Sequence, residues 1–350
     1  MRQKLFTFFL MIFPVIVWGQ NSGTYAFTFL EEPVSARMMA LGQSGLAIYD
    51  NDITLALANP SLINKEMNND LAFSYVHYFT GINYGQVQYA GNLRRLGSFL
   101  LSVQSLNYGK FDYATVNGTR EGTFGAADYA LAVGWGRVLN EHFSIGATGR
   151  LINSYYESYS SFGFSVDVAG TYRNDKGWTA SLVASHIGLQ LKGFVSGVTA
   201  PLPFNLSLAA SKKMDHAPFR FTLVADHLEK WDLTYRNPVD PIGTVDPITG
   251  DTIPLTGVSG FADKLMRHII VGTELYLGKN VVLRLGYNYR RRQELALAER
   301  KGLVGFSWGF GIRISRFQIN YARSTYHVSG SPNYFTVTTS LDSFRTARYR

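Results

Sequence analysis

A Gly-x-Ser-x-Gly sequence occurs late in the chain, from Gly305 to Gly309. In serine hydrolases this pattern forms a sharp turn between a strand and a helix, which exposes the serine as a nucleophile. Here Ser307 lies inside a run in which large and small residues alternate, and no helical pattern follows it. We therefore interpret Ser307 as a small strand residue and predict that the protein is not an enzyme.

Other patterns that could support chemistry are incomplete. The histidines are scattered and do not have the spacing of metal ligands. Asp50-Asn51-Asp52 lacks the downstream glycine and glutamate of a calcium loop, and we interpret it as a turn and a helix cap. Asp226 and His227 are neighbours, which in a strand would point to opposite faces. With no cysteine and no phosphate-binding loop, we predict no catalytic residue, no metal site and no cofactor.

Basic residues gather most densely between residues 290 and 301. Solvated loop charge is one interpretation. The alternative is a surface that contacts lipopolysaccharide phosphate or an acidic partner, since guanidinium groups bind such anions well. The net charge of +8 is otherwise dispersed, which does not favour nucleic-acid binding. This candidate basic surface cluster consists of Arg290, Arg291, Arg292, Arg300 and Lys301.

A proline-rich stretch between residues 233 and 260 is a candidate partner-binding loop. Its prolines would stiffen the chain and its aspartates keep it polar, which favours protein contact over an oily entrance. An irregular loop without a partner is the alternative. The candidate residues are Pro238, Asp240, Pro241, Asp246, Pro247, Asp251 and Pro254.

The elements that carry these residues alternate with period two from about Leu71 onward. From Val304 to Ile312, for example, large residues alternate with Gly305, Ser307, Gly309 and Gly311. One face is bulky and the other is dominated by Gly, Ala, Ser and Thr, which suits a barrel with lipid outside and a polar lumen. After the first twenty positions there is no apolar run of about 20 residues, the length that a membrane helix needs. We predict an all-β fold, a transmembrane antiparallel β-barrel of about fourteen strands.

The connections between the predicted strands alternate in length. Short ones fall near residues 92–95, 140–141, 174–176, 214–216, 278–280 and 314–315. Longer ones span residues 109–124, 190–202, 229–263 and 291–301, while the first hairpin, near Gly81, is tight. Outer-membrane barrels have short periplasmic turns and longer extracellular loops. We therefore predict a barrel in a Gram-negative outer membrane with both termini periplasmic.

Three regions follow from this pattern. Residues 1–19 are predicted to be a signal peptide, with an uncleaved anchor as the alternative. Residues 20–65 do not alternate; we predict short helices at 33–42 and 53–58 and a lumen plug, with a periplasmic extension as the alternative. Residues 66–350 form the barrel. We expect its lumen-facing charges to pair with one another or with the plug: Asp128, Arg150, Asp167, Arg220, Asp226, Glu274 and Arg284.

The N-terminal region resembles that of the PorQ family, outer-membrane components of the Bacteroidetes type IX secretion system. The similar stretches are residues 24–30, 33–37, 40–42 and 50–60, and the plug motif comprises Ser35, Arg37, Gly42, Asn59 and Pro60. The Asn-Pro element is shared with the wider PorV and FadL group of plugged fourteen-strand barrels. Many outer-membrane barrels end on an aromatic residue, whereas this sequence ends Arg348-Tyr349-Arg350, and we interpret Phe344 as the last strand residue.

The resemblance implies a role in attaching secreted cargo to the cell surface. PorQ-like proteins are associated with the surface protein PorZ, in a complex with PorU and PorV. The implied function is a non-enzymatic barrel that anchors a PorZ-like partner, in contact with membrane lipid and lipopolysaccharide. The alternative is a FadL-like transporter of hydrophobic small molecules, which would need an apolar pocket and a way past the plug.

Overall fold

The computed structural model describes residues 25–114, 117, 119–234, 244–245, 252–253, 257–295, 302–326 and 330–345. The predicted signal peptide lies outside these ranges. No helix within them has the length and apolar character needed to cross a membrane.

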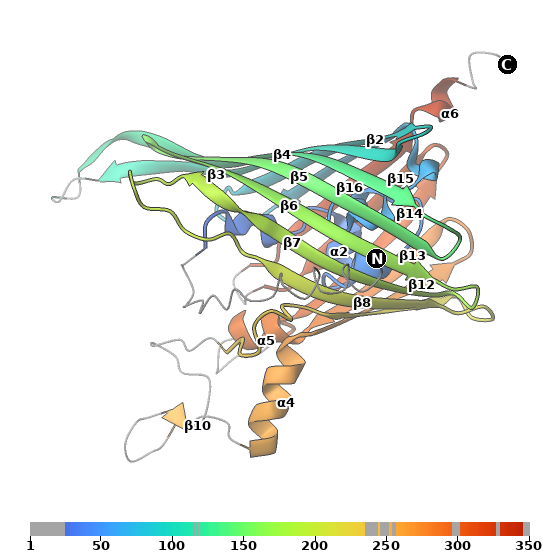
Figure 1. Cartoon of the computed structure of the whole chain (residues 1–350). Coiled ribbons are helices and arrows are strands. Elements are labelled where there is room, and N and C mark those ends of the chain that lie inside the picture. The colour runs from blue at the N-terminus through green and yellow to red at the C-terminus, as the bar shows by residue number, and fades with distance from the viewer. Residues whose placement is uncertain are drawn as a thin grey trace, which may run out of the picture.

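Within the described residues, fourteen strands form one closed antiparallel barrel (Figure 1). The first and last strands close it, with Asp70 opposite Ser340. Neighbours along the chain pair with each other, and a separate two-stranded hairpin is inserted between β9 and β12. The barrel strands are β1 (Asp70–His77), β2 (Asn83–Leu93), β3 (Gly97–Ala114), β4 (Arg120–Val138), β5 (Phe143–Tyr156), β6 (Tyr159–Arg173), β7 (Trp178–Lys192), β8 (Asn205–Lys213), β9 (Phe219–Ala225), β12 (Ile269–Leu277), β13 (Val281–Asn288), β14 (Phe306–Ile314), β15 (Phe317–Ser324) and β16 (Asn333–Ser340). The hairpin consists of β10 (Thr244–Val245) and β11 (Thr252–Ile253).

The two faces of the barrel differ as the alternation predicts. On β14, Phe306 and Trp308 are exposed on the outside, while Ser307 and Gly309 are buried inside. Ser307 donates a hydrogen bond to the hydroxyl of Ser324 on the neighbouring strand. The prediction of a fourteen-strand barrel with a bulky outer face and a small-residue inner face is confirmed, and Ser307 lies on a strand rather than at a turn.

The connections differ between the two ends of the barrel. At one end, which we call the short-turn end, all the connections between barrel strands are brief, such as Leu93 to Gly97 and Val138 to Phe143. At the other, the long-loop end, most are longer and two contain helices: α4 (Gly257–Arg267) before β12 and α5 (Tyr289–Leu295) after β13. Residues 70 and 340, where the barrel begins and ends, both lie at the short-turn end.

Two connections at the long-loop end depart from the sequence prediction. Residues 109–124 are largely strand rather than loop. The β3 strand continues to Ala114 and the β4 strand begins at Arg120, and their pairing is irregular in this part. Stacking of Phe111 on Phe124, with ring centroids 5.3 Å apart, supports this extension. The connection between β5 and β6, from Tyr156 to Tyr159, is tight like that near Gly81.

Residues 28–67 lie inside the barrel as a chain of short helices, drawn in blue in Figure 1, and we call them the lumen segment. Their apolar side chains form the buried core together with the inner wall; Met39, Ile53 and Leu55 have no exposed area. The α2 helix packs against β14 and β15, and the turn after Asn59 packs against β4, β5 and β6. The elements are η1 (Thr28–Glu31), α2 (Ala36–Ala40), η2 (Gly45–Ala47), α3 (Ile53–Ala56), η3 (Pro60–Leu62) and η4 (Lys65–Met67), and α6 (Asp342–Arg345) follows the barrel. Phe344 therefore lies on α6, after the last strand rather than within it.

Candidate functional site: the lumen segment and the cavities beside it

Two polar residues of the lumen segment, Ser35 and Asp52, cap its two α-helices. The Ser35 hydroxyl accepts the amide hydrogen of Met38 at the start of α2, and Asp52 does the same for Thr54 at the start of α3. The hydroxyls of Ser35 and Thr54 are 2.9 Å apart, which joins the two helices. Gly42 follows α2 with a φ of +68°, a left-handed conformation that favours glycine. Both helices are shorter than predicted.

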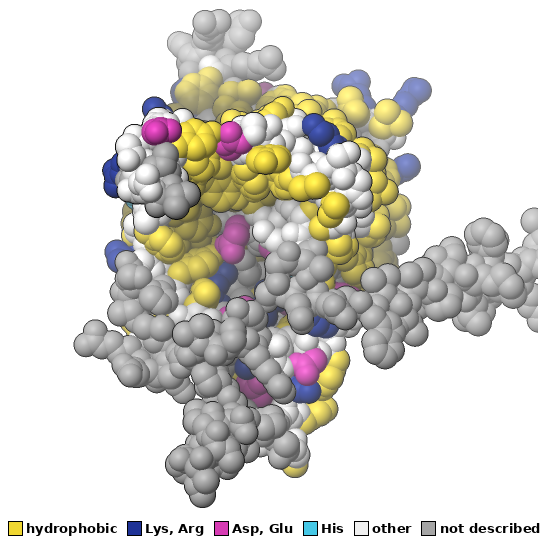
Figure 2. Space-filling view, turned by 90° about the vertical axis from the view of Figure 1, so that its left-hand side faces the viewer, with side chains coloured by type: hydrophobic (Ala, Val, Ile, Leu, Met, Phe, Trp, Pro, Cys, Tyr) yellow, Lys and Arg dark blue, Asp and Glu magenta, His cyan; other side chains and the backbone are white. Residues whose placement is uncertain are grey.

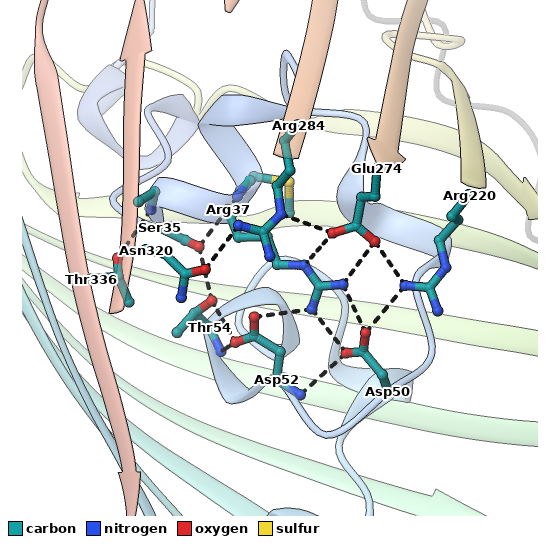
Figure 3. Close-up of polar contacts among 12 residues, drawn as sticks. Ser35, Arg37, Asp50, Asp52, Thr54, Arg220, Glu274, Arg284, Asn320 and Thr336 are labelled. Carbon is teal, nitrogen blue, oxygen red and sulfur yellow. Dashed lines mark hydrogen bonds and ion pairs between the residues drawn. The ribbon is translucent and has the colours of Figure 1, made fainter. Parts of the chain in front are cut away.

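Arg37 of α2 stands at the centre of a buried group of charges that we call the ionic anchor (Figure 3). Its Nε lies 2.9 Å from Glu274 Oε1, its Nη2 lies 2.8 Å from Asp50 Oδ2, and its Nη1 lies 3.0 Å from Asp52 Oδ2. Glu274 also accepts bonds from the barrel arginines 220 and 284, at 3.0 and 2.9 Å. The ionic anchor thus joins three arginines to three carboxylates: Arg37, Asp50, Asp52, Arg220, Glu274 and Arg284.

Burial and charge act against each other in this group. Burial alone would raise the pKa of the Asp50 carboxyl, but the adjacent Arg37 and Arg220 guanidiniums hold it below its ordinary value. Burial likewise disfavours the charged form of Arg37, yet Asp50, Glu274 and Asp52 raise its pKa well above the usual range. A buried ion-pair network adds little net stability but leaves an uncompensated charge when one partner is removed. Its effect is therefore to fix the lumen segment in one position.

A second contact, which we call the close-packed anchor, holds Asn59–Ile63 without charge. The Asn59 side chain accepts the amide hydrogen of Ser61 at 3.0 Å and donates to the Leu46 carbonyl oxygen at 2.6 Å. The Ser61 hydroxyl lies 2.6 Å from that of Thr171 on β6. A β-carbon placed on Gly146 of β5 would lie 2.2 Å from the Pro60 carbonyl oxygen. Only glycine therefore allows this close approach of the turn to the wall.

A cavity of about 390 Å³ lies between the lumen segment and the barrel, toward the long-loop end. Figure 2 looks onto this end and shows hydrophobic side chains over the outer rim with charged side chains within. We call it the outer cavity. Its apolar lining includes Leu30, Val34, Met38, Leu46, Leu57 and Ile270, and its polar lining includes Glu31, Arg150, Ser185, Asp226, Arg291 and Tyr326.

A second cavity, of about 290 Å³, lies toward the short-turn end and is lined by Arg37, Asp52 and residues of the short turn at Lys279 and Asn280. We call it the inner cavity. Met38, the neighbour of Arg37 in α2, and Thr54 of α3, whose amide is capped by Asp52, line the outer cavity instead. The α2 and α3 helices therefore stand between the two cavities, fastened there by the ionic anchor.

The predicted lumen-facing charges, which we call the wall charges, lie inside the barrel, and most of them are paired. Arg150 forms an ion pair with Asp167, and its second Nη donates to the Leu57 carbonyl oxygen of the lumen segment at 3.0 Å. Arg220, Glu274 and Arg284 belong to the ionic anchor. Asp128 differs, because it accepts bonds from the hydroxyls of Tyr108 and Tyr156 rather than from a cation.

The prediction that Asp226 and His227 point to opposite faces is wrong. The β9 strand ends at Ala225, and His227 has a left-handed φ of +54°, which turns its ring back toward Asp226. His227 Nε2 lies 3.6 Å from Asp226 Oδ2 and 3.7 Å from Glu31 Oε1, while Nδ1 lies 2.9 Å from Glu229. Burial raises the pKa of the Glu31 carboxyl at the rim of the outer cavity. Among the described residues, no group of this kind could hold a metal ion.

The predicted basic cluster divides in the structure. Its first three residues lie on α5, and Asn288 caps this helix by accepting the Arg291 amide hydrogen. Arg291 is buried rather than on the surface, with its guanidinium 4.5 Å from the centre of the Tyr326 ring. Arg292 donates to the carbonyl oxygens of Gly302 and Val304. Arg300 and Lys301 lie outside the described residues, as do all seven candidates of the proline-rich loop.

Sequence reasoning located Arg37 and the wall charges but missed the outer cavity. Glu31, Met38 and Tyr326 carried no motif, and only the path of the lumen segment brings them together. Each residue of the plug motif has a structural role. Ser35 caps α2, Arg37 is the centre of the ionic anchor, and Gly42 is the left-handed residue after α2. Asn59 and Pro60 form the turn of the close-packed anchor.

Comparison with known proteins shows the fold. No protein-family model and no curated protein matches this sequence. Among solved structures, the toluene transporter TodX of Pseudomonas putida is similar over 91% of this chain and 98% of its own, at 11% identity and a TM-score of 0.51. A Pseudomonas aeruginosa FadL homologue covers 88% of this chain and 98% of its own, at 10% identity and a TM-score of 0.48. The likeness to TodX shows that this chain shares the barrel fold of that protein.

Proposed function

We propose that this protein is a channel for a small apolar compound, closed at rest by its lumen segment. The observation that carries the proposal is the pair of cavities on either side of α2 and α3. The outer cavity has the size of a small-ligand site, roughly 300–1,000 Å³, and combines an apolar lining with a few polar groups. A compound held there needs only displacement of the ionic anchor to reach the inner cavity.

The likeness to TodX supports the same substrate class, because that protein is a toluene transporter with the same fold. Toluene is therefore the first compound to test. The initial rate of uptake of radiolabelled toluene should be higher in bacterial cells that carry this barrel than in cells with an empty vector.

A variant that fills the outer cavity sharpens this test. Ser185 lines the cavity on β7, away from the ionic anchor, so Ser185→Trp should fill it while the barrel still assembles. Uptake should return to the empty-vector rate in Ser185→Trp and be retained in Ser185→Ala. Uptake that Ser185→Trp leaves at the wild-type rate would count against passage through this cavity.

We further propose that the long-loop end faces the outside and that both termini are periplasmic, as is usual for barrels with short turns at one end. The chain has no cysteine, so single cysteines can be introduced without background. In intact cells a membrane-impermeant maleimide should label Ser158→Cys at the long-loop end and leave Asp175→Cys unlabelled. The reverse pattern would invert the orientation.

Anchoring of a surface partner is a second candidate function. The observation that favours it is the extended β3–β4 hairpin, which exposes Phe111 and Tyr113, both packed against the partly buried Phe124. Exposed aromatic residues are common at protein interfaces. Combined with the resemblance to the PorQ family, they fit a PorZ-like surface protein, with PorU-like and PorV-like proteins in the same complex.

A pull-down of the tagged barrel from native membranes tests this second candidate. It should recover a large surface protein, and deletion of the gene should release that protein and its cargo into the medium. Phe111→Ser combined with Phe124→Ser should weaken the capture, whereas Ser185→Trp should not. Cargo that stays attached in the deletion strain would rule out anchoring and leave the transport proposal intact.

A further inference from the structure

Among the described residues, the α4 helix carries an exposed apolar stripe at the long-loop end. Val258, Phe261 and Leu265 are spaced by three and four residues, which places them on one helix face. They are exposed to 87%, 58% and 43%. Figure 1 shows α4 projecting away from the barrel, beside α5.

The opposite face of α4 is polar and turned toward the protein. Arg267 is buried and its Nε lies 2.8 Å from Asp263 Oδ2. Asp263 also accepts a bond from the Tyr289 hydroxyl of α5 at 2.9 Å. Lys264 forms an ion pair with Asp232 at 2.7 Å. Both cations of the helix are therefore neutralised by carboxylates of this chain.

The apolar stripe continues the outer surface of the barrel. The α4 helix ends at Arg267 and β12 begins at Ile269, so Leu265 is followed closely by the outward-facing Val271. Val271 pairs with Leu223 of β9, and both are exposed on the outer face. In a barrel that spans a membrane, this face contacts lipid.

Trp231 lies beside the apolar stripe of α4, near the point where this helix joins the barrel. Its ring lies 5.4 Å from that of Phe261 and is half exposed. His268 fixes the Trp231 segment against the end of β9 through the carbonyl oxygens of Trp231 and Asp226. Tryptophan is enriched where a membrane protein crosses the boundary between acyl chains and headgroups.

We infer that α4 lies in the outer-leaflet interface of the membrane, with Val258, Phe261 and Leu265 facing the acyl chains. The occupant of the stripe is the lipid itself. An amphipathic helix binds such an interface through its buried apolar area, with attraction to anionic lipid as a separate contribution. Because Lys264 and Arg267 are already paired, the apolar stripe alone should hold α4 there. This inference rests on the barrel fold and, for the choice of leaflet, on the orientation proposed above; it is independent of transport or anchoring.

Site-directed fluorescence of the full chain in phosphatidylcholine vesicles tests the inference. An environment-sensitive label is attached to Phe261→Cys or Leu265→Cys, and quenching by brominated phosphatidylcholine is compared with quenching by aqueous iodide. Leu208→Cys, on the outer face of β8, is the lipid-facing reference. Glu294→Cys, exposed on α5, is the water-facing reference.

The expected result is that both α4 labels are quenched by brominated lipid as strongly as the label at Leu208 and are protected from iodide. This pattern should be the same with and without added phosphatidylglycerol. Quenching by iodide as at Glu294 would place the stripe in water and overturn the inference. Protection from both quenchers would show that a protein or a second copy covers it, and quenching only with anionic lipid would assign the binding to charge; either result also overturns it.

Discussion

The two anchors of the lumen segment hold it by different chemistry. The ionic anchor joins α2 and the turn at Asp50 to β9, β12 and β13 through ion pairs. The close-packed anchor joins Asn59–Ile63 to β4, β5 and β6 through hydroxyl groups and backbone contact with glycine. One is central between the two cavities, and the other lies against the wall.

The difference shows which part of the segment is suited to move. Each charge of the ionic anchor depends on its partners, so a change in one of them disturbs all. The close-packed anchor has no titratable group and relies on fit, which changes little with pH or salt. We therefore expect α2 and α3 to be released before the Asn59 turn.

The largest effect is expected from Arg37→Met. Removal of the central cation leaves buried carboxylates uncompensated, which costs about 3–5 kcal/mol. Hydrogen exchange at the Met39 and Leu55 amides, both bonded within the segment, should accelerate by roughly a hundredfold or more. The strand amides of β5 should be unaffected.

Arg120→Met is the matched control for this change. Arg120 also pairs with a carboxylate, Asp112, at 2.9 Å, but its side chain is 78% exposed. An exposed pair contributes about 0–1 kcal/mol, so exchange in the lumen segment should not change. Equal protection in Arg37→Met and wild type would show that the ion pairs do not hold the segment.

Gly146→Ala should disturb the other anchor by a smaller amount. The added methyl group would meet the Pro60 carbonyl oxygen at 2.2 Å and force the turn away, an overpacking cost of about 1–3 kcal/mol. Exchange at the Ile63 amide, which bonds to the Pro60 carbonyl oxygen, reports the change. Gly149→Ala on the same strand meets no atom within 4 Å and should behave like wild type.

Asn59→Ala tests the cap inside the same turn. The loss of a capping side chain costs about 1 kcal/mol, here combined with the lost bond to Leu46. The Ile63 amide should exchange faster than in wild type. The α2 amides should stay as protected as in wild type. Asn51→Ala, which removes only an exposed bond to Glu66, serves as the control. Exchange that accelerates at α2 as much as at Ile63 would show that the two anchors open together.

The smallest effect is expected from a change in pH, which should weaken the ionic anchor but not the close-packed anchor. The folded pKa of Asp50 is lowered, so its contribution is present above the unfolded value near 4 and is lost as pH falls through the folded value. Pepsin cleavage within residues 36–58 should therefore increase as pH falls below about 4. Cleavage near Asn59 should not increase, and cleavage of Asp50→Asn should depend on pH less than that of wild type, since Asp52 and Glu274 still face Arg37. A cleavage rate in wild type that does not depend on pH would show that Asp50 does not hold the lumen segment in place.

Much of the fold follows from the sequence because its signals are local. Alternation in β14 places Trp308 outside and Ser307 inside from neighbouring residues alone, and the barrel has the strand number that this pattern predicts. Ser35 and Asp52 cap helices within three residues of themselves. The hairpin at residues 109–124 was misjudged because stacking of Phe111 on Phe124 depends on the pairing of two strands.

The site was decided by tertiary structure. Arg37 and Glu274 are 237 residues apart, and only closure of the barrel around the lumen segment brings them to 2.9 Å. Period two shows that Glu274 faces inward but not which cation it meets. His227 turned toward Asp226 because the strand ended one residue before Asp226, a boundary set by the pairing of β9 with β12. Composition and alternation thus determine a membrane barrel, while the contacts that close its lumen depend on residues distant in the chain.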